Sequence, residues 1–340
     1  MEQRPIIECV PNFSEGRDLF VIQAISNAIE AVPGVKLLHV DIGKDANRTV
    51  MTFAGTPDAV VQAAFEAIRV AAEKIDMREH HGEHPRIGAT DVCPLVPVSN
   101  ISMEAVIGYA NVLARRVGEA LDIPVYLYEE AATAPLRKNL AAIRTGEYEG
   151  LAKKILDPVW KPDYGPTRFN ARSGATVIGA RDFLIAYNIN LNTQSVSVAK
   201  SIAAQLRESG RSFVENGLKK NQPGLLRSVK AIGWYMDDYG FAQVSTNLTN
   251  INTTPLHEAF EVCRQLAEER GLTVSGSELI GMVPLRVFLD AGRYFAKRDG
   301  LASGAISEAA LIAIAVQALG LDFRGNFDAL TRIIEYQLDT

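Results

Sequence analysis

The fold of this chain is organised around one stretch, His80-His81-Gly82-Glu83-His84-Pro85-Arg86-Ile87-Gly88-Ala89-Thr90-Asp91-Val92-Cys93-Pro94, which leads directly into Leu95-Val96-Pro97-Val98. The stretch holds three of the five histidines of the chain, together with two carboxylates and one arginine. Its glycine and proline residues oppose a regular element, whereas the apolar run that follows is typical of a strand. Because loops on a rigid scaffold often carry chemistry and histidine titrates near neutral pH, the pattern predicts a functional loop beside a strand.

The residues around this loop alternate between strand and helix patterns. Before it, strands are predicted at 5–10, 35–42 and 48–54, and amphipathic helices at 21–32 and 57–75. Ser14 is a candidate N-cap for the first of these helices. After the loop, a strand is predicted at 92–98, a helix at 103–121 and a strand at 124–128. The order β-α-β-β-α-β, with one helix and one strand added, predicts a ferredoxin-like sheet.

The second half of the chain repeats this order. A strand at 183–191, a helix at 195–209, strands at 229–236 and 242–248, a helix after Thr254-Pro255 and a strand at Val274 follow one another. We therefore predict an α/β (α+β) protein of two ferredoxin-like β-α-β-β-α-β subdomains, with mixed sheets, helices on one face and a ligand cleft between them. The expected domains are residues 1–180 and 181–340, the second with a helical C-terminal tail.

The composition limits the class of protein. With 340 residues, 47% hydrophobic and 22% charged, the chain suits two globular domains. A net charge of −5 argues against a nucleic-acid partner. The N-terminus does not resemble a signal peptide, and no apolar run is long enough to span a membrane. Three cysteines, odd in number and far apart, favour reduced thiols, so we expect a cytoplasmic protein.

Several motif interpretations compete for the loop. His80-x-x-Glu83-His84 matches a zinc signature that requires a helix, but Gly82 and Pro85 disfavour helical geometry, so we expect no metal. Dinucleotide, P-loop and nucleophile-elbow motifs do not occur. Cys93 could be a nucleophile, although its apolar setting favours a core thiol. The other histidines are expected to be surface or structural residues, and only His84 has a constrained position.

Two further segments carry candidate binding residues. Residues 157–169 are rich in proline, glycine and aromatic residues, which suits either a fixed loop that lines a flat heterocycle or an ordered crossover between domains. The strand at 183–191 places Asn188 and Asn190 on one face, because side chains alternate along a strand.

These residues carry a resemblance to a known family. The chain is similar to glutamate formiminotransferase, in its free-standing bacterial form without a cyclodeaminase, over nearly its whole length. The motifs that carry the resemblance are Glu8-Cys9-Val10-Pro11-Asn12-Phe13-Ser14-Glu15-Gly16, Asp41 with Asn47-Arg48-Thr49-Val50, Gly82-Glu83-His84-Pro85-Arg86, Asp91-Val92-Cys93-Pro94, Pro124-Val125-Tyr126-Leu127-Tyr128, Gly174-Ala175-Thr176 with Gly179-Ala180-Arg181, Asn188-Ile189-Asn190-Leu191 and Gly233-Trp234-Tyr235.

The resemblance implies an activity and a set of site residues. The family transfers the formimino group of N-formimino-L-glutamate to tetrahydrofolate in histidine degradation. It implies His84 as the catalytic acid and base, with Glu83 or Asp91 as orienting groups. Its folate-binding loop corresponds to Gly165, Pro166, Thr167, Arg168, Phe169, Asn170, Ala171, Arg172, Ser173 and Gly174. The candidate substrate-binding residues are Asp41, Arg48, Arg86, Asn188 and Asn190, with the arginines suited to carboxylates.

The expected partners are small molecules, with tetrahydrofolate as co-substrate, and the resemblance implies a homodimer. Three alternatives stay open. The enzyme could be a formyltransferase that uses N-formylglutamate or 5-formyltetrahydrofolate, the chain could bind folate without turnover, or it could be a zinc-dependent amidohydrolase.

Overall fold

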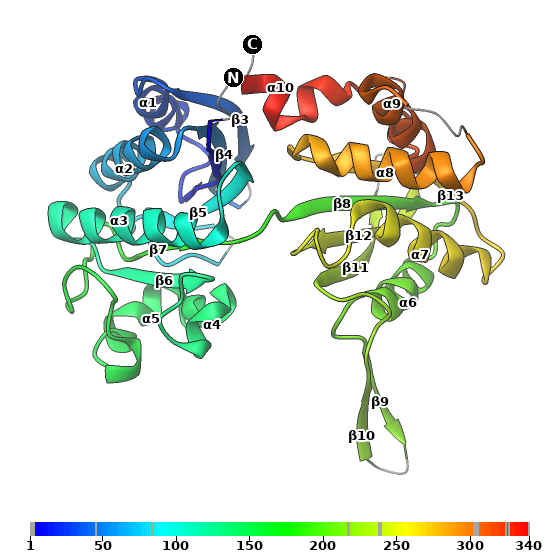
Figure 1. Ribbon diagram of the computed structural model, residues 1–340. Coiled ribbons are helices and arrows are strands. Elements are labelled where there is room, and N and C mark those ends of the chain that lie inside the picture. Colours follow the sequence, from blue (N-terminus) through cyan, green and yellow to red (C-terminus); the bar gives the residue numbers. More distant parts are fainter. Residues whose placement is uncertain are drawn as a thin grey trace. The chain divides into compact units, whose positions relative to one another are not determined.

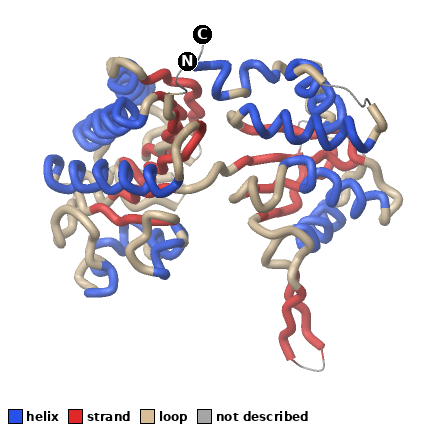
Figure 2. Tube along the Cα trace, viewed as in Figure 1, coloured by secondary structure: helices blue, strands red, loops and turns tan. Residues whose placement is uncertain are grey.

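The computed structural model describes residues 4–44, 46–82, 85–215, 218–236, 240–301, 306–323, 325 and 327–338 (Figure 1). By the contacts within the chain, it divides into two compact units, Met1–Arg181 and Asp182–Thr340. Each unit contains one main sheet with helices packed against it (Figure 2). Within the described ranges, no helix combines the length and hydrophobicity that crossing a bilayer requires.

The first unit contains seven strands, and the helical elements alternate with them along the chain. In order, the elements are β1 (Ile6–Cys9), β2 (Asn12–Phe13), α1 (Leu19–Glu30), β3 (Val35–Gly43), β4 (Arg48–Gly55), α2 (Pro57–Lys74), β5 (Thr90–Ser99), α3 (Met103–Leu121), β6 (Val125–Glu129), η1 (Pro135–Lys138), α4 (Leu140–Arg144), α5 (Glu147–Lys154), η2 (Pro158–Trp160) and β7 (Thr176–Ala180).

The first sheet is mixed. Strands β1 and β2 both lie between β4 and β5 in antiparallel pairing, and β3 pairs with β4. The order β3-β4-β1/β2-β5 is the one expected when β-α-β-β-α-β folds as a ferredoxin-like sheet. Beyond it, β7 lies between β5 and β6 and is parallel to both. Strand β7 was not predicted, and it lies between two strands that precede it in the sequence.

The faces of this sheet have separate cores. Helices α1, α2 and α3 cover one face with a core that contains Phe13, Met51, Phe53 and Leu95. At the β5-β7-β6 end, a second core packs Ile143 of α4 and Leu151 of α5 on the other face, against Val92, Tyr126, Tyr128 and Val177. The predicted arrangement with helices on one face therefore holds for α1, α2 and α3, whereas α4 and α5 pack on the other face.

The second unit repeats the strand order, and its described strands pair in antiparallel fashion. Its elements are β8 (Ile185–Leu191), α6 (Val196–Leu206), β9 (Arg211–Glu215), β10 (Leu218–Gln222), β11 (Val229–Met236), β12 (Phe241–Leu248), α7 (Leu256–Glu268), β13 (Val274–Ile280), α8 (Leu285–Arg298), α9 (Glu308–Leu319), η3 (Ala329–Arg332) and α10 (Ile334–Leu338). The sheet order is β11-β12-β8-β13, all antiparallel. The unpredicted hairpin β9–β10 extends away from this sheet (Figure 1).

The predicted fold class is confirmed, with local differences. Mixed pairing occurs in the first sheet, whereas the described strands of the second sheet are antiparallel. The N-cap prediction was wrong: Asp18 caps α1 by accepting the N–H groups of Phe20 and Val21. Ser14 instead donates its hydroxyl to the Gly88 carbonyl at 2.7 Å, so the hydroxyl binds the loop before β5.

Candidate active site

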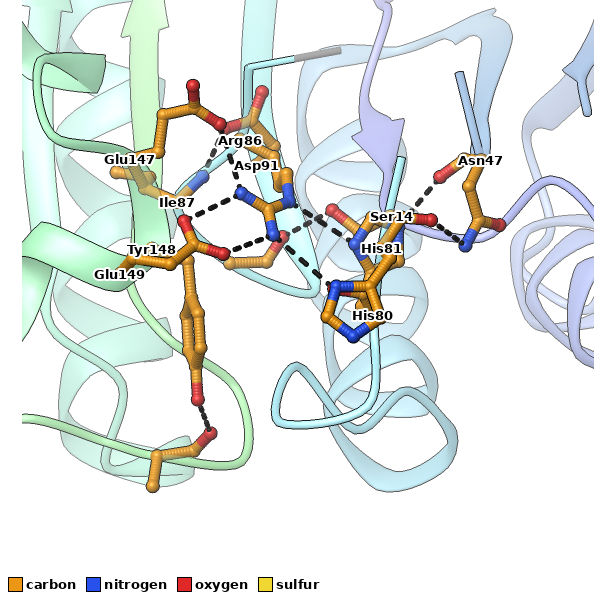
Figure 3. Close-up of polar contacts among 12 residues, drawn as sticks. Ser14, Asn47, His80, His81, Arg86, Ile87, Asp91, Glu147, Tyr148 and Glu149 are labelled. Atoms are coloured by element: carbon orange, nitrogen blue, oxygen red, sulfur yellow. Dashed lines mark hydrogen bonds and ion pairs between the residues drawn. The ribbon is translucent and has the colours of Figure 1, made fainter. Parts of the chain in front are cut away.

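The histidine loop, residues 80–89, is fixed at its end by Asp91. The pairing of β2 with β5 shifts register between Asn12 and Phe13, which makes Asp91 an extra residue on β5. Such a bulge re-aims a side chain and is frequent beside active sites. The buried Asp91 carboxylate accepts the Ile87 N–H at 2.9 Å (Figure 3). It also pairs with Arg144 at the end of α4. Asp91 therefore links the loop to α4.

His80 is buried and bonded through both ring nitrogens. Its Nε2 lies 2.9 Å from the Asn47 carbonyl oxygen, and its Nδ1 lies 3.3 Å from Nε of Arg86 (Figure 3). A carbonyl can only accept and a guanidinium can only donate, so His80 is the neutral tautomer with its proton on Nε2. Burial lowers the pKa of His80, and the charge of Arg86 lowers it further.

His80 is therefore more constrained than the sequence predicted. The expectation that only His84 has a fixed position was wrong, because two partners hold the His80 ring. Both nitrogens are already bonded, and residues 80–82 are not helical. Neither fact suits a zinc ligand of the H-x-x-E-H type.

Asn47, in the turn between β3 and β4, connects this turn to the histidine loop and to Gly16. Its side chain accepts the Gly16 N–H at 2.9 Å and donates to the His81 carbonyl at 3.0 Å. Its φ of 46° is left-handed, a conformation that asparagine tolerates better than most residues. A Cβ on Gly82 would lie 2.3 Å from the Ala46 carbonyl oxygen, so the loop backbone packs directly on this turn. The sequence motif contained Asn47 but did not reveal this role.

The donors of Arg86 are occupied within the protein. Its guanidinium forms ion pairs with Glu147 at 3.0 Å and Glu149 at 2.6 Å, both on α5 (Figure 3). Its Nη2 also donates to the His80 carbonyl at 3.3 Å. The Arg86 side chain is only 8% exposed. The structure thus places Arg86 as a bridge between the histidine loop and α5.

The 165–174 loop joins the histidine loop directly. Gly174 forms a β-bridge with Gly88, and Ala89 donates its N–H to the Ser173 carbonyl at 2.9 Å. A Cβ on Gly174, whose φ is +67°, would lie 2.1 Å from the Ile87 carbonyl oxygen, so the two backbones need glycine at this contact. The two predicted loops are therefore adjacent.

Other contacts hold the 165–174 loop in place. Arg172 donates to the Glu73 carbonyl at 2.6 Å, at the end of α2. The Tyr148 hydroxyl donates to the Ala171 carbonyl at 2.5 Å, and its ring packs against Phe169 with centroids 5.4 Å apart. The loop is thus an ordered segment with an aromatic contact.

Asp41 and Arg48 lie on the face of the first sheet turned away from α1, α2 and α3. On β4, Met51 belongs to the helix-side core, so Arg48 and Val50 point to the opposite face. Asp41 pairs with Val50 in register and shares this face. Arg48 donates through Nε at 2.8 Å, and also through Nη2, to the side-chain oxygen of Asn12.

Asn188 and Asn190 lie on the corresponding face of the second sheet. Gly233 of β11 packs against α6, so its register partner Val244 faces the helices. The neighbouring Gln243, with its partner Asn190 on β8, faces the opposite way. Gln243 donates to the Asn190 side-chain oxygen at 2.7 Å and to Glu278 at 2.8 Å. Asn190 is fully buried, and its Nδ2 has no partner.

Glu83 and His84 lie outside the described residues. Among the residues that are described, no group of three or more His, Cys, Asp or Glu side chains converges as a metal site. Cys93 is buried in the helix-side core, with its Sγ 3.5 Å from that of Cys9. Burial raises the pKa of Cys9 well above its usual value, which suits a core thiol.

Two family models match this chain. The formiminotransferase domain, N-terminal subdomain, matches residues 6–181, and the formiminotransferase domain matches residues 186–339. These matches cover most of the sequence, so the chain belongs to the formiminotransferase family. The resemblance found in the sequence motifs is confirmed at this level.

Curated relatives of two lengths resemble the chain. It is 47% identical to the formimidoyltransferase-cyclodeaminase of Dictyostelium discoideum and 50% identical to that of Gallus gallus, over 98% and 97% of this chain. The chain spans 60% and 59% of the length of those proteins. It is 44% identical to the glutamate formimidoyltransferase of Thermoplasma acidophilum, over 89% of this chain and 96% of that protein.

Proposed function

We propose that this chain is a glutamate formimidoyltransferase, which moves the formimino group of N-formimino-L-glutamate to N5 of tetrahydrofolate. The observation that carries the proposal is the bridge between Gly88 and Gly174, which makes the histidine loop and the 165–174 loop neighbours. Membership of the family and the name of the Thermoplasma acidophilum relative support the same activity.

The chemistry needs one proton acceptor that later becomes a donor. N5 of tetrahydrofolate attacks the formimino carbon and loses a proton, and the bond from that carbon to the glutamate nitrogen then breaks as this nitrogen gains a proton. The products are 5-formiminotetrahydrofolate and L-glutamate. One imidazole with a pKa near ambient pH can perform both transfers, and we assign this role to His84.

The groups around His84 have supporting roles in this proposal. Glu83 is adjacent in the sequence and is a candidate to orient the imidazole. Asp91 acts as a positioning residue, because its carboxylate binds the Ile87 N–H and the Arg144 guanidinium. Arg86 also positions the loop, through its ion pairs to α5. No metal takes part in this proposed mechanism, so activity should persist after treatment with a chelator. Loss of activity together with loss of a stoichiometric metal ion would contradict the mechanism.

The remaining predicted residues are proposed to bind the substrates. Residues 165–174 bind tetrahydrofolate, with Phe169 and Tyr148 as the adjacent rings. Asp41, Arg48, Asn188 and Asn190 contact the formimino donor. Their support is that Asp41 and Arg48 lie on the face of the first sheet opposite α1, α2 and α3, and that Asn188 and Asn190 lie on the face of the second sheet opposite α6.

Product analysis tests the activity directly. Purified protein is mixed with tetrahydrofolate and either N-formimino-L-glutamate or N-formyl-L-glutamate, and folate products are separated and weighed by mass spectrometry. We expect 5-formiminotetrahydrofolate from the first donor and little product from the second. Formyl transfer at the higher rate would support the formyltransferase alternative, and binding without product would support a folate-binding protein.

Hydrogen–deuterium exchange tests the folate assignment. Adding 5-formyltetrahydrofolate should slow the exchange of amides in residues 165–174 and in the histidine loop. The loop at residues 131–134, also in the first unit, serves as a control that should not change. Protection that omits residues 165–174 would contradict the assignment.

We also propose that the protein is a cytoplasmic homodimer. The dimer follows from the resemblance to the family, and light scattering at micromolar concentration should give twice the mass of the chain. The cytoplasmic location agrees with three cysteines that are free and buried. A monomeric mass, or recovery of the protein from an oxidising compartment, would contradict these two statements.

A further inference from the structure

Two arginines gather beside Asp91 with unused hydrogen-bond donors. Arg48 begins β4 and Arg144 ends α4. The partner of Arg48 is the neutral amide oxygen of Asn12, and within the described ranges no carboxylate forms an ion pair with it. Arg144 pairs with Asp91 through Nη2, while its Nε is buried and has no partner. An unpartnered buried donor is costly and calls for an acceptor.

The charges in this cluster are unbalanced. Asn12, which binds Arg48, pairs in register with Val92, the residue after Asp91, and Asp91 binds Arg144. Burial lowers the pKa of Arg48, and the charge of Arg144 lowers it further. Asp91 is the buried carboxylate that opposes them, whereas Asp41, which also attracts Arg48, is exposed. Counting only the residues that the structure describes, the cluster thus has one more guanidinium than buried carboxylates. An arriving anion would offset the excess and would accept the unused N–H groups.

We propose that Arg48 and Arg144 together bind a carboxylate of a glutamyl group. This assignment rests on the proposed function, because both substrates of that reaction carry glutamyl carboxylates. The donor N-formimino-L-glutamate is one source, and the glutamate tail of tetrahydrofolate is the other. Arg144 was not among the predicted site residues, and it takes the role that the sequence suggested for Arg86, whose donors are occupied by α5.

The geometry explains why two arginines are needed. Asp91 holds Arg144 in place and at the same time holds the histidine loop through Ile87. A carboxylate bound to Arg144 would therefore be connected to the backbone of the histidine loop through the buried Asp91 side chain. Arg48, held by Asn12 on the same face, supplies a second planar donor group. Arginine forks bind carboxylates with fixed geometry, which would orient the substrate relative to the loop.

Steady-state kinetics of Arg48→Gln and Arg144→Gln tests the proposal. Each variant should raise the KM of the glutamyl substrate by about 10- to 100-fold, the size expected for a lost charge-assisted contact. The donor KM and the tetrahydrofolate KM are measured separately, with the monoglutamate form of the folate. A rise in the donor KM alone identifies the donor, and a rise in the folate KM alone identifies the folate tail. Both results support the carboxylate pair.

The controls separate binding from folding. Arg144→Gln leaves Asp91 without its cation and can unfold the protein, so Arg48→Gln, which keeps the Asp91–Arg144 pair, is the decisive variant. The matched control is Arg69→Gln, whose ion pairs to Glu66 and Glu73 lie on the surface of α2. If Arg48→Gln folds and leaves both KM values within two-fold of the wild type, or lowers kcat alone, the proposal is wrong.

A binding experiment distinguishes this proposal from the proposed function. Calorimetric titration with L-glutamate, and with tetrahydrofolate monoglutamate, does not depend on turnover. Arg48→Gln should weaken the binding of at least one of them by about 10-fold or more, and Arg69→Gln should change neither. If the protein transfers no formimino group but this loss is seen, the carboxylate pair stands and the reaction assignment fails. If transfer occurs but binding is unchanged, only the carboxylate pair fails.

Discussion

The two sheets share one strand order, but the face opposite α1, α2 and α3 in the first sheet and the face opposite α6 in the second carry different chemistry. On the first sheet this face has Arg48, Asp41 and the carboxylate of Asp91, all charged. On the second sheet it has the amides Asn188, Asn190 and Gln243 with one carboxylate, Glu278, which accepts a hydrogen bond from Gln243. The same β-α-β-β-α-β order thus supports a cluster of arginines and carboxylates in one unit and hydrogen bonding dominated by amides in the other. The function therefore depends on which side chains and loops the fold carries, because the fold fixes only their positions.

The largest expected effect concerns the histidine loop of the first unit. His84→Ala should lower kcat by about 10²- to 10⁴-fold, because a positioned acid-base group contributes that much to rate. Folate affinity should stay within a few fold, since the interaction is made mainly in the transition state. The matched control is His81→Ala, because His81 is an exposed neighbour whose backbone carbonyl, not its side chain, accepts the hydrogen bond from Asn47. Near-full activity in His84→Ala would remove the proton-transfer role from the first unit.

Asn47 should contribute more to the free energy of unfolding than an ordinary residue with a left-handed backbone conformation. Asn47→Ala loses the hydrogen bonds to Gly16 and His81 and places a less tolerant residue at positive φ. We expect a loss of about 2–3 kcal/mol in the free energy of unfolding in urea, with a lower kcat. Asn100→Ala is the matched control, because Asn100 has a φ of 54° but is exposed. Equal losses in the two variants would show that the Asn47 hydrogen bonds add nothing.

The amides of the second unit predict that, unlike Asn47→Ala, a substitution there can weaken substrate binding without a large loss of stability. Asn190→Leu removes a buried Nδ2 that has no partner, but it also removes the oxygen that accepts from Gln243, which keeps its bond to Glu278, so the free energy of unfolding should change by less than about 1 kcal/mol. The KM of the formimino donor should nevertheless rise by about five- to ten-fold if Asn190 contacts it, as expected for one lost neutral hydrogen bond. Thermal unfolding and steady-state kinetics measure the two quantities. A destabilised variant with unchanged KM would make Asn190 a structural residue and would contradict its proposed contact with the formimino donor.

The smallest expected effect is a pH dependence that His80 gives to the first unit. Its pKa is lowered in the fold by burial and by Arg86, so the folded protein binds fewer protons than the unfolded chain near pH 6.5. The stabilisation is therefore fully present above the unfolded pKa of 6.5 and is lost as the pH falls toward the lower folded value. Urea unfolding of the wild type and His80→Gln should converge as the pH falls from 7.5 to 5. Curves for the wild type and His80→Gln that run parallel over this range would mean that His80 is not held neutral.

Local signals in the sequence determined much of the secondary structure. Helix α3 spans Met103–Leu121 as predicted, because the apolar period of 3.6 and the Ser102 cap are both encoded within the segment. Strands β11 and β4 were predicted to within one residue, because the alternation of period two that marks a strand is also encoded within the segment. The motifs also marked the histidine loop and residues 165–174 as one site, and the structure brings the described parts of both together.

Only the tertiary structure decided which side chains pair across long separations. The sequence alone determined that the histidine loop holds titratable groups, and its glycine and proline residues predicted an irregular segment. It did not determine that Arg86 binds Glu149, 63 residues away, or that Asp91 binds Arg144, 53 residues away. It also missed β7, which enters between β5 and β6. Local propensity cannot select such partners, because each is fixed by the packing of helices and strands that are distant in the chain.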